Sequence, residues 1–260
     1  MKYFRETVRI LEKVYGTRDR ANIAVALGNI ARIKRDRGDL DGALKQFQEV
    51  LRIEKKAYGT RLHSDVALTL QEMAKTMRAK GDKVGALRQF SRVVRIMQEL
   101  HHTREHVEVA VPLMELGVAN CESGDGNDVA AVKRGSDLID EAEHIIFVDG
   151  TPASPQLHSS FLIASGKRFR CARDPASAAK AFSSALDIIQ ERVSSNKKNN
   201  LELAEIQFQL GRALVEKGDV DQGSELLGDA LKTRRAALRI NNKPVPDSHP
   251  WIAEILAVQS

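Results

Sequence analysis

Apolar residues recur along this chain at the spacing of amphipathic α-helices. Between Leu27 and Leu51, apolar side chains three or four positions apart stand on both sides of a polar turn at Gly38 and Asp39. That spacing places side chains on one face of a helix, because an α-helix turns once in about 3.6 residues. The segment therefore predicts two helices joined by a tight turn.

The same two-helix pattern returns after 43 residues. Val14–Thr17 (VYGT) returns as Ala57–Thr60 (AYGT), and Arg35–Phe47 returns as Arg78–Phe90 with its Gly-Asp turn unchanged. Three further copies are recognisable, and six extra residues before the fourth predict a lengthened helix over 127–147. Repeats of two helices that each contact their neighbours are typical of solenoids. We expect one domain over residues 1–260, with repeats at 22–60, 64–103, 106–150, 154–196 and 199–241 and partial repeats at 1–17 and 249–260.

Glycines mark most of the turns inside the repeats. A helix end often needs a left-handed backbone conformation, which is cheap only for glycine. The fourth repeat has Asp174 and Pro175 there instead, and proline suits the first turn of a helix. Small residues on the first helix of each repeat predict a close approach to large residues on the second. The turn glycines are Gly38, Gly81, Gly124 and Gly218; the small residues are Ala31, Ala74, Gly117, Gly166 and Gly211; the large ones are Phe47, Phe90, Phe182 and Leu227.

These positions resemble the tetratricopeptide repeat family. Its pattern of large and small residues is met in the first repeat by Leu27, Ile30, Ala31, Ala43, Phe47 and Val50. The longer period, the His63–Leu70 stretch (HSDVALTL) and the His249–Ala253 stretch (HPWIA) are similar to the kinesin light chain group. The resemblance implies an all-α fold, a right-handed α-solenoid of antiparallel helix pairs, and a non-catalytic scaffold for protein–protein interaction.

Both ends of the sequence fall inside repeats. The first predicted helix carries apolar residues nearly all round, as an interior helix does, whereas a capping helix has a polar outer face. The two partial repeats are interpreted either as natural caps of the solenoid or as the ends of a fragment of a longer array. Self-association of the chain also stays open. The apolar residues are Tyr3, Phe4, Val8, Ile10, Leu11 and Val14.

Composition narrows the class of protein. Hydrophobic residues make up 42% and charged residues 29% of the chain, which suits a folded protein, and aromatic residues reach only 5%. No stretch approaches the roughly 18 uncharged apolar residues of a membrane helix, and the first residues lack the apolar core of a secretory signal. Cys121 and Cys171 stand alone, without the spacing of a disulfide framework or a zinc site. We therefore expect a cytoplasmic protein with reduced thiols and no membrane partner.

Basic residues recur on the first helices, which line the concave surface of a solenoid. When the repeats are aligned, the basic residues fall at two equivalent positions of the first helix and so form two rows. Val118 and Cys121 interrupt these rows in the third repeat. Such rows suit an acidic peptide, because guanidinium groups grip carboxylates with two parallel hydrogen bonds. Asn29 joins the candidates through its place in the kinesin-light-chain-like stretch Leu27–Ala31. The basic candidates for peptide binding are Arg32, Arg35, Lys75, Arg78, Lys167, Arg170 and Arg212.

Two other interpretations of these rows stay open. Lysine and arginine are common on solvated helix faces, and a net charge of +5 with a pI near 9.2 is mild. Alternatively, a basic helical-repeat face binds nucleic acid through phosphates. That alternative is less favoured, because the face offers almost no aromatic residues for base stacking and also carries acidic ones. The acidic residues are Glu72, Glu115, Glu122, Glu205 and Glu216.

The sequence carries no signature of catalysis. Phosphate-binding loops, HExxH and GxSxG motifs are missing, and no histidine aligns beside either cysteine in the repeat register. His101, His102 and His106 invite a metal hypothesis, but His106 occupies the repeat position of His63 at a helix entry. We expect no catalytic residue, no metal site and no cofactor.

Overall fold

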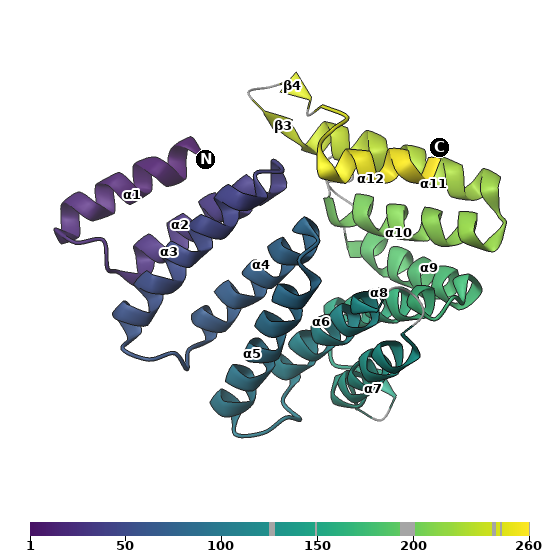
Figure 1. Ribbon diagram of the computed structural model, residues 1–260, viewed down its shortest axis with the longest axis horizontal. Coiled ribbons are helices and arrows are strands. Elements are labelled where there is room, and N and C mark those ends of the chain that lie inside the picture. The colour runs from purple at the N-terminus through teal and green to yellow at the C-terminus, as the bar shows by residue number, and fades with distance from the viewer. Residues whose placement is uncertain (125–127, 149, 193–200, 241–242, 245, 260) are drawn as a thin grey trace. The chain divides into compact units, whose positions relative to one another are not determined.

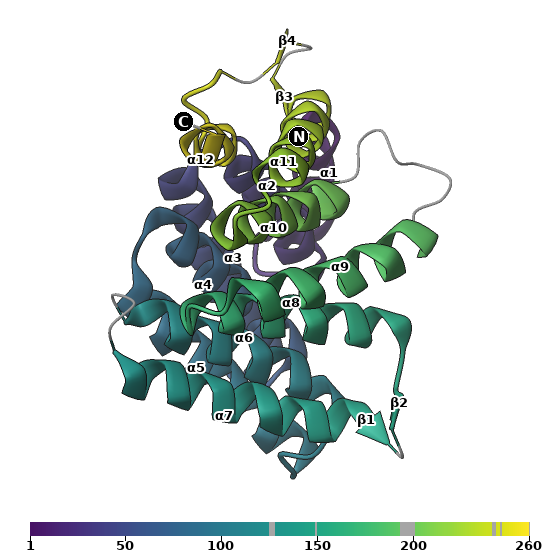
Figure 2. The same cartoon turned by 90° about the vertical axis from the view of Figure 1, so that its right-hand side faces the viewer.

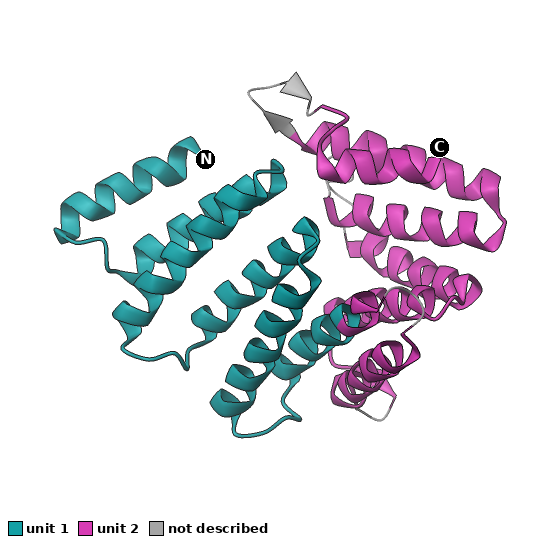
Figure 3. Cartoon of the chain, in the orientation of Figure 1, with its two compact units in different colours: residues 1–119 teal, residues 120–260 magenta. Residues whose placement is uncertain are grey.

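The structure is a computed structural model that describes residues 1–124, 128–148, 150–192, 201–240, 243–244 and 246–259 (Figures 1 and 2). Its contacts divide the chain into two compact units, residues 1–119 (unit 1) and residues 120–260 (unit 2) (Figure 3). Helices dominate both units, and consecutive helices run in opposite directions within each (Figure 1). The all-α fold of antiparallel helix pairs is therefore confirmed.

Unit 1 is built from six helices in chain order. α2 packs against α3, and α4 packs against α5. α1 also packs against α2, and α3 packs against α4. Phe47 and Phe90 on the second helices are fully buried, and so are the small residues Ala31 and Ala74 on the first helices. The helices are α1 (Lys2–Tyr15), α2 (Ala21–Asp36), α3 (Leu40–Tyr58), α4 (Ser64–Lys80), α5 (Lys83–His101) and the larger part of α6 (Val107–Ser123).

Unit 2 continues the same plan. α8 packs against α9, α9 against α10 and α10 against α11, with α7 on α8 and α12 on α11. A side-chain carbon added to Gly166 would lie 2.5 Å from the Phe182 ring, so the predicted close approach requires glycine at this position. The helices are α7 (Val129–Ile146), α8 (Pro155–Cys171), α9 (Pro175–Arg192), α10 (Leu201–Lys217), α11 (Val220–Ala237) and α12 (Pro250–Gln259).

Two short hairpins were not predicted. Strands β1 (Phe147–Val148) and β2 (Thr151–Pro152) pair antiparallel, as do β3 (Arg239–Ile240) and β4 (Lys243–Pro244). The first hairpin overlaps the proline-containing stretch 150–155 (GTPASP), and the second overlaps the stretch 241–247 (NNKPVPD). A polar stretch without proline, Ser194–Asn200 (SSNKKNN), lies outside the described residues, as does the expected helix start at Asn127.

The turns inside the repeats follow the prediction in three copies. Gly38, Gly81 and Gly218 have φ of 80°, 88° and 105°. The prediction is wrong at Gly124, which does not have a positive φ; a side-chain carbon there would lie 2.7 Å from the Asp128 Cβ atom, so glycine serves a close approach. In the fourth copy the left-handed residue is Arg173, with φ of 61°.

Among the described residues, no helix combines the length and apolar character that crossing a bilayer requires.

Candidate functional site

The predicted basic residues of unit 1 lie on the first helices, where glutamates of the next first helix meet them. Arg35 on α2 donates to Glu72 on α4, with Nη1 and Oε2 2.7 Å apart, and Arg32 Nε lies 3.3 Å from the same oxygen. One repeat later, Lys75 Nζ and Arg78 Nη1 lie 3.2 and 3.1 Å from the two carboxylate oxygens of Glu115 on α6. Each glutamate is thus shared by two cations of the preceding repeat.

Unit 2 contains a related arrangement. Arg170 on α8 grips Glu216 on α10 with two hydrogen bonds of 2.9 and 3.0 Å and also donates to Gln209. Arg212 reaches the same glutamate from its own helix, at 3.1 Å. Burial raises the pKa of Glu216, but Arg170 and Arg212 outweigh it and hold that pKa below its usual value. Lys167 is half-buried on α8, one turn before Arg170.

These ion pairs show that the basic rows, predicted as a peptide-binding surface, also hold neighbouring helices together. The sequence predicted the glutamates only as acidic residues on the same face, whereas Glu72, Glu115 and Glu216 form ion pairs that join successive first helices. The signal was present as a constant separation of 37 residues between Arg35 and Glu72 and between Arg78 and Glu115. Val118 and Cys121, which interrupt the rows, are buried.

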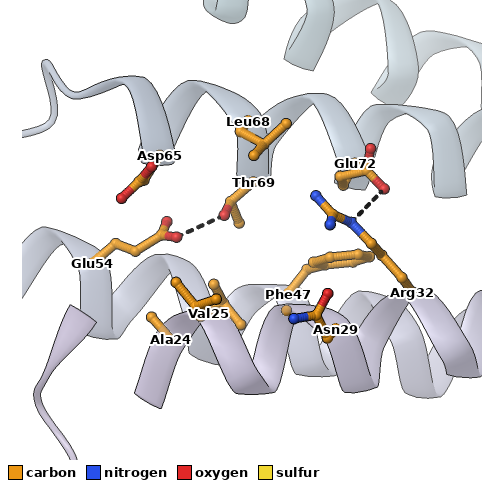
Figure 4. Close-up of a pocket in the computed structure, with 12 residues that line it drawn as sticks. Ala24, Val25, Asn29, Arg32, Phe47, Glu54, Asp65, Leu68, Thr69 and Glu72 are labelled. Carbon is orange, nitrogen blue, oxygen red and sulfur yellow. Dashed lines mark hydrogen bonds and ion pairs between the residues drawn. The ribbon is translucent and has the colours of Figure 1, made fainter. Parts of the chain in front are cut away.

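A pocket of about 100 Å³ opens between α2 and α4, above α3 (Figure 4). Val25 and Leu68 stand at it with 59% and 46% of their surface exposed, which is high for apolar side chains. Asn29 and the ion pair of Arg32 with Glu72 lie at one end, and Glu54 and Asp65 lie at the other. The pocket therefore brings together two predicted residues, Asn29 and Arg32. Its lining is completed by Ala24, Gly28, Phe47, Val50 and Thr69.

Glu54 is the polar group that sequence analysis missed. It is only 5% exposed; one carboxyl oxygen accepts a hydrogen bond from Thr69 Oγ1 at 2.9 Å, and the other, Oε2, has no hydrogen-bond partner. Burial raises the pKa of Glu54 to about 7, the Thr69 hydrogen bond works against that rise, and the nearby charge of Asp65 adds to it. A buried carboxyl group with an unmatched oxygen is costly, so its presence calls for a reason.

Histidines gather at the entry to α6. His101 Nε2 lies 2.9 Å from Glu108 Oε2, and the His101 and His106 rings stack 3.7 Å apart with an angle of 8° between their planes. One ligand atom from each of the three residues lies within 4.8 Å of the others. A metal ion binds in the plane of an imidazole ring, and two parallel stacked planes have no such point in common. The same contacts recur as Tyr58 on His63 and Tyr58 on Asp65, so they serve the turn between repeats.

The two cysteines are free thiols in unit 2. Cys121 is buried, and its Sγ lies 3.7 Å from the backbone carbonyl of Val132. Its interaction with Cys171, followed by burial, raises the pKa of Cys121, while the same interaction lowers the pKa of Cys171. A buried thiol with a raised pKa is a poor nucleophile.

Residues 22–99, which contain α3, α4 and nearly all of α2 and α5, match the family model of the tetratricopeptide repeat. The match covers less than a third of the chain. It confirms the resemblance inferred from the packing residues. Tetratricopeptide repeats generally mediate protein–protein interaction, and scaffolds built from them are generally not enzymes.

Solved structures are similar to this chain over most of its length. The chain is similar to BtubC (BKLC) from P. vanneervenii with a TM-score of 0.55 at 16% identity, over 91% of this chain and 89% of that one. It is also similar to a candidate kinesin light chain of Podosopora anserina with nearly identical TPR-like repeats, with a TM-score of 0.47 at 17% identity, over 83% and 96% of the two chains. No curated protein sequence matches the chain.

Proposed function

We propose that this chain is a non-catalytic cytoplasmic scaffold that binds a peptide or protein partner along its first helices, with the pocket between α2 and α4 as the anchor. The observation that carries the proposal is this pocket, formed by two successive tetratricopeptide repeats. Its exposed Val25 and Leu68 side chains offer apolar contact, and Asn29 and Arg32 offer hydrogen-bond donors beside it. Concave pockets that combine apolar walls with a few polar groups are the usual sites of ligand recognition.

An acidic stretch in the partner fits the charge of the first helices. Arg35 and Arg78 are 16% and 23% exposed and hold the glutamates, whereas Arg32 and Lys75 are 39% and 31% exposed. Arg35 also lies 3.4 Å from Asp36, so Arg32 and Lys75 are the more exposed and less tightly held cation of each pair. Arg32 and Lys75 therefore contact the partner, and Lys167 and Arg212 are the corresponding residues in unit 2. Arg170 is 15% exposed and holds Glu216, as Arg35 and Arg78 hold their glutamates.

Nucleic acid gains no support from the structure. A phosphate-tracking groove needs an uninterrupted cationic surface, and here Glu72, Glu115 and Glu216 are interleaved with the arginines.

Peptide pools test the proposal directly. Fluorescence anisotropy would compare acidic, neutral and basic pools of degenerate peptides on the whole chain, and we expect the acidic pool to bind most tightly. Arg32→Gln with Lys75→Gln should weaken that binding at least about tenfold, because two exposed charges are lost while Arg35 and Arg78 still hold the glutamates. Glutamine is chosen because a charge reversal would place a carboxylate beside Glu72.

The matched control removes the same charge from the second helices. Lys45 on α3 and Arg88 on α5 are exposed and stand 43 residues apart, as do Arg32 and Lys75. Lys45→Gln with Arg88→Gln should leave the affinity unchanged. Equal losses in both double variants, or no binding of any pool, would refute the proposal.

A further inference from the structure

Glu54 breaks the repeat pattern at a buried position. Forty-three residues earlier and later the chain has Leu11 and Met97, which pack in the apolar interior. Its partner Thr69 likewise replaces Ala26 and Pro112. A polar pair therefore stands at one step of the array where the neighbouring steps are apolar. Natural sequences depart from such local consistency mainly at functional sites.

The departure coincides with the pocket. Glu54 and Thr69 both line it, and the carboxyl oxygen that Thr69 does not use has no hydrogen-bond partner. In Figure 4 the Glu54 side chain points toward Thr69 beneath Asp65. The pocket thus contains an acceptor that a bound group would satisfy.

The charges around this end favour a cation. Asp65 adds a second carboxylate, which accepts a hydrogen bond from Tyr58 Oη and lies 3.8 Å from His63. The described residues place no lysine or arginine in an ion pair with Glu54 or Asp65. Arg32 lines the same pocket, but it pairs with Glu72 at the opposite end.

The walls favour a slender apolar stem. Val25, Leu68 and Ala24 line the approach, and the volume of about 100 Å³ is below the 150 Å³ or so of a cavity that holds benzene. A lysine side chain meets both demands, because it has a flexible four-carbon stem and three donors on a compact ammonium group.

We infer that the pocket between α2 and α4 is a lysine-recognition site, in which Glu54 and Asp65 receive the ammonium group of a partner lysine and Val25 and Leu68 cover its stem. This inference rests on the proposed function, since the lysine belongs to the bound peptide. Within an acidic partner, such a lysine fixes the register of the peptide on the array.

Peptide pools with one fixed residue test the site. In a degenerate acidic background, the fixed position would be lysine, acetyl-lysine, norleucine, glutamine or serine, and affinity for the whole chain would be measured by fluorescence anisotropy. We expect the lysine pool to bind at least about tenfold more tightly than the norleucine and acetyl-lysine pools, because only the ammonium neutralises the buried carboxylate.

Replacement of Glu54 by the residue of the next repeat isolates the acceptor. Glu54→Met should abolish the preference for lysine while retaining binding of the norleucine pool, and circular dichroism would verify that the variant is folded. Glu49→Met, at a half-exposed glutamate of the same helix, should keep the preference. A preference for serine or glutamine over lysine, or an unchanged preference in Glu54→Met, would overturn the inference and leave the proposed function intact. Failure of every pool to bind would instead refute the proposed function.

The lysine preference should also depend on pH. Since the pKa of Glu54 is about 7, the carboxyl group must lose a proton to pair with an ammonium, and the lysine pool should bind about tenfold more weakly at pH 6 than at pH 8. The other titratable or charged groups around Glu54 are Tyr58 on its own helix, Asp65 and Glu72 on α4, Arg32 on α2 and His63 before α4. Glu54→Met retains all of them, so the dependence should disappear in this variant. Its persistence there would show that Glu54 is not its cause and would overturn this part of the inference.

Discussion

At the scale of single residues, Glu54 is a buried carboxyl group whose ionised form destabilises the folded protein. Its raised pKa means that the folded protein prefers the protonated form. Protonated Glu54 therefore contributes fully to the free energy of unfolding below pH 4.5, the pKa of the carboxyl group in the unfolded chain. This contribution is lost as the pH rises through about 7, the pKa in the folded protein. The carboxyl group is 5% exposed, so little solvent screening reduces this effect.

Glu54→Met should therefore stabilise the protein increasingly as the pH rises. We compare the free energies of unfolding of the variant and the wild type at each pH. The difference in favour of the variant should be up to about 3 kcal/mol larger at pH 8 than at pH 4, because only the wild type must bury a carboxylate. Denaturant unfolding at several pH values measures the difference. Gln48→Met, on the exposed side of α3, should give a difference that is flat with pH. A flat difference for Glu54→Met would contradict the raised pKa.

Single residues also mark the limit of sequence analysis. Arg32, Lys75 and the other basic residues were found because they recur at equivalent positions when the repeats are aligned. Their engagement by Glu72 and Glu115 was not found, because it depends on how successive helices are offset. The polar pair of Glu54 and Thr69 was visible as a departure from the repeat, but only burial and a missing partner give it meaning.

At the scale of elements, aspartates set where the second helices begin. Asp39, Asp82 and Asp128 each accept a hydrogen bond from the backbone N–H three residues on, as an N-cap does. Asp219 makes no such bond, and its carboxylate accepts from Lys217 Nζ instead. The Gly-Asp turns were predictable because this chemistry is local. The β1–β2 hairpin was missed because its stretch offers only turn residues and no alternating apolar pattern.

Alanine substitutions separate the capping aspartates from the one that does not cap. Asp82→Ala should lower the free energy of unfolding by about 1 kcal/mol, because the N–H of Gly85 at the start of α5 loses its partner. Asp219→Ala should change it by no more than about 0.5 kcal/mol, because an exposed ion pair is all that it loses. Thermal and denaturant unfolding would measure both. Equal costs would show that the aspartates act through charge near the helix start and not through the capping bond.

At the scale of the whole molecule, ion pairs join successive first helices inside each unit. Within unit 1 they run from α2 to α4 and on to Glu115 of α6. The next positions of the two rows on α6, Val118 and Cys121, are apolar, and the boundary between the units falls between residues 119 and 120. The sequence showed the interruption but predicted one domain, because the 43-residue period continues across it. The single domain stays a prediction that local stability measurements test.

Amide hydrogen exchange on two glutamate variants distinguishes one cooperative domain from two. Glu72→Gln leaves Arg32 and Arg35 facing a neutral partner at a site only 8% exposed, which should cost about 1–3 kcal/mol and speed exchange in α2 and α4 roughly tenfold to a hundredfold. Repeats contact only their neighbours, so α8 to α11 should exchange at the wild-type rate. Glu216→Gln should act on α8 and α10 instead, and less strongly, because its partnered side chain is 37% exposed. If Glu72→Gln accelerated exchange equally in both units, residues 1–260 would unfold as one domain, and the boundary near residue 119 would have no energetic meaning.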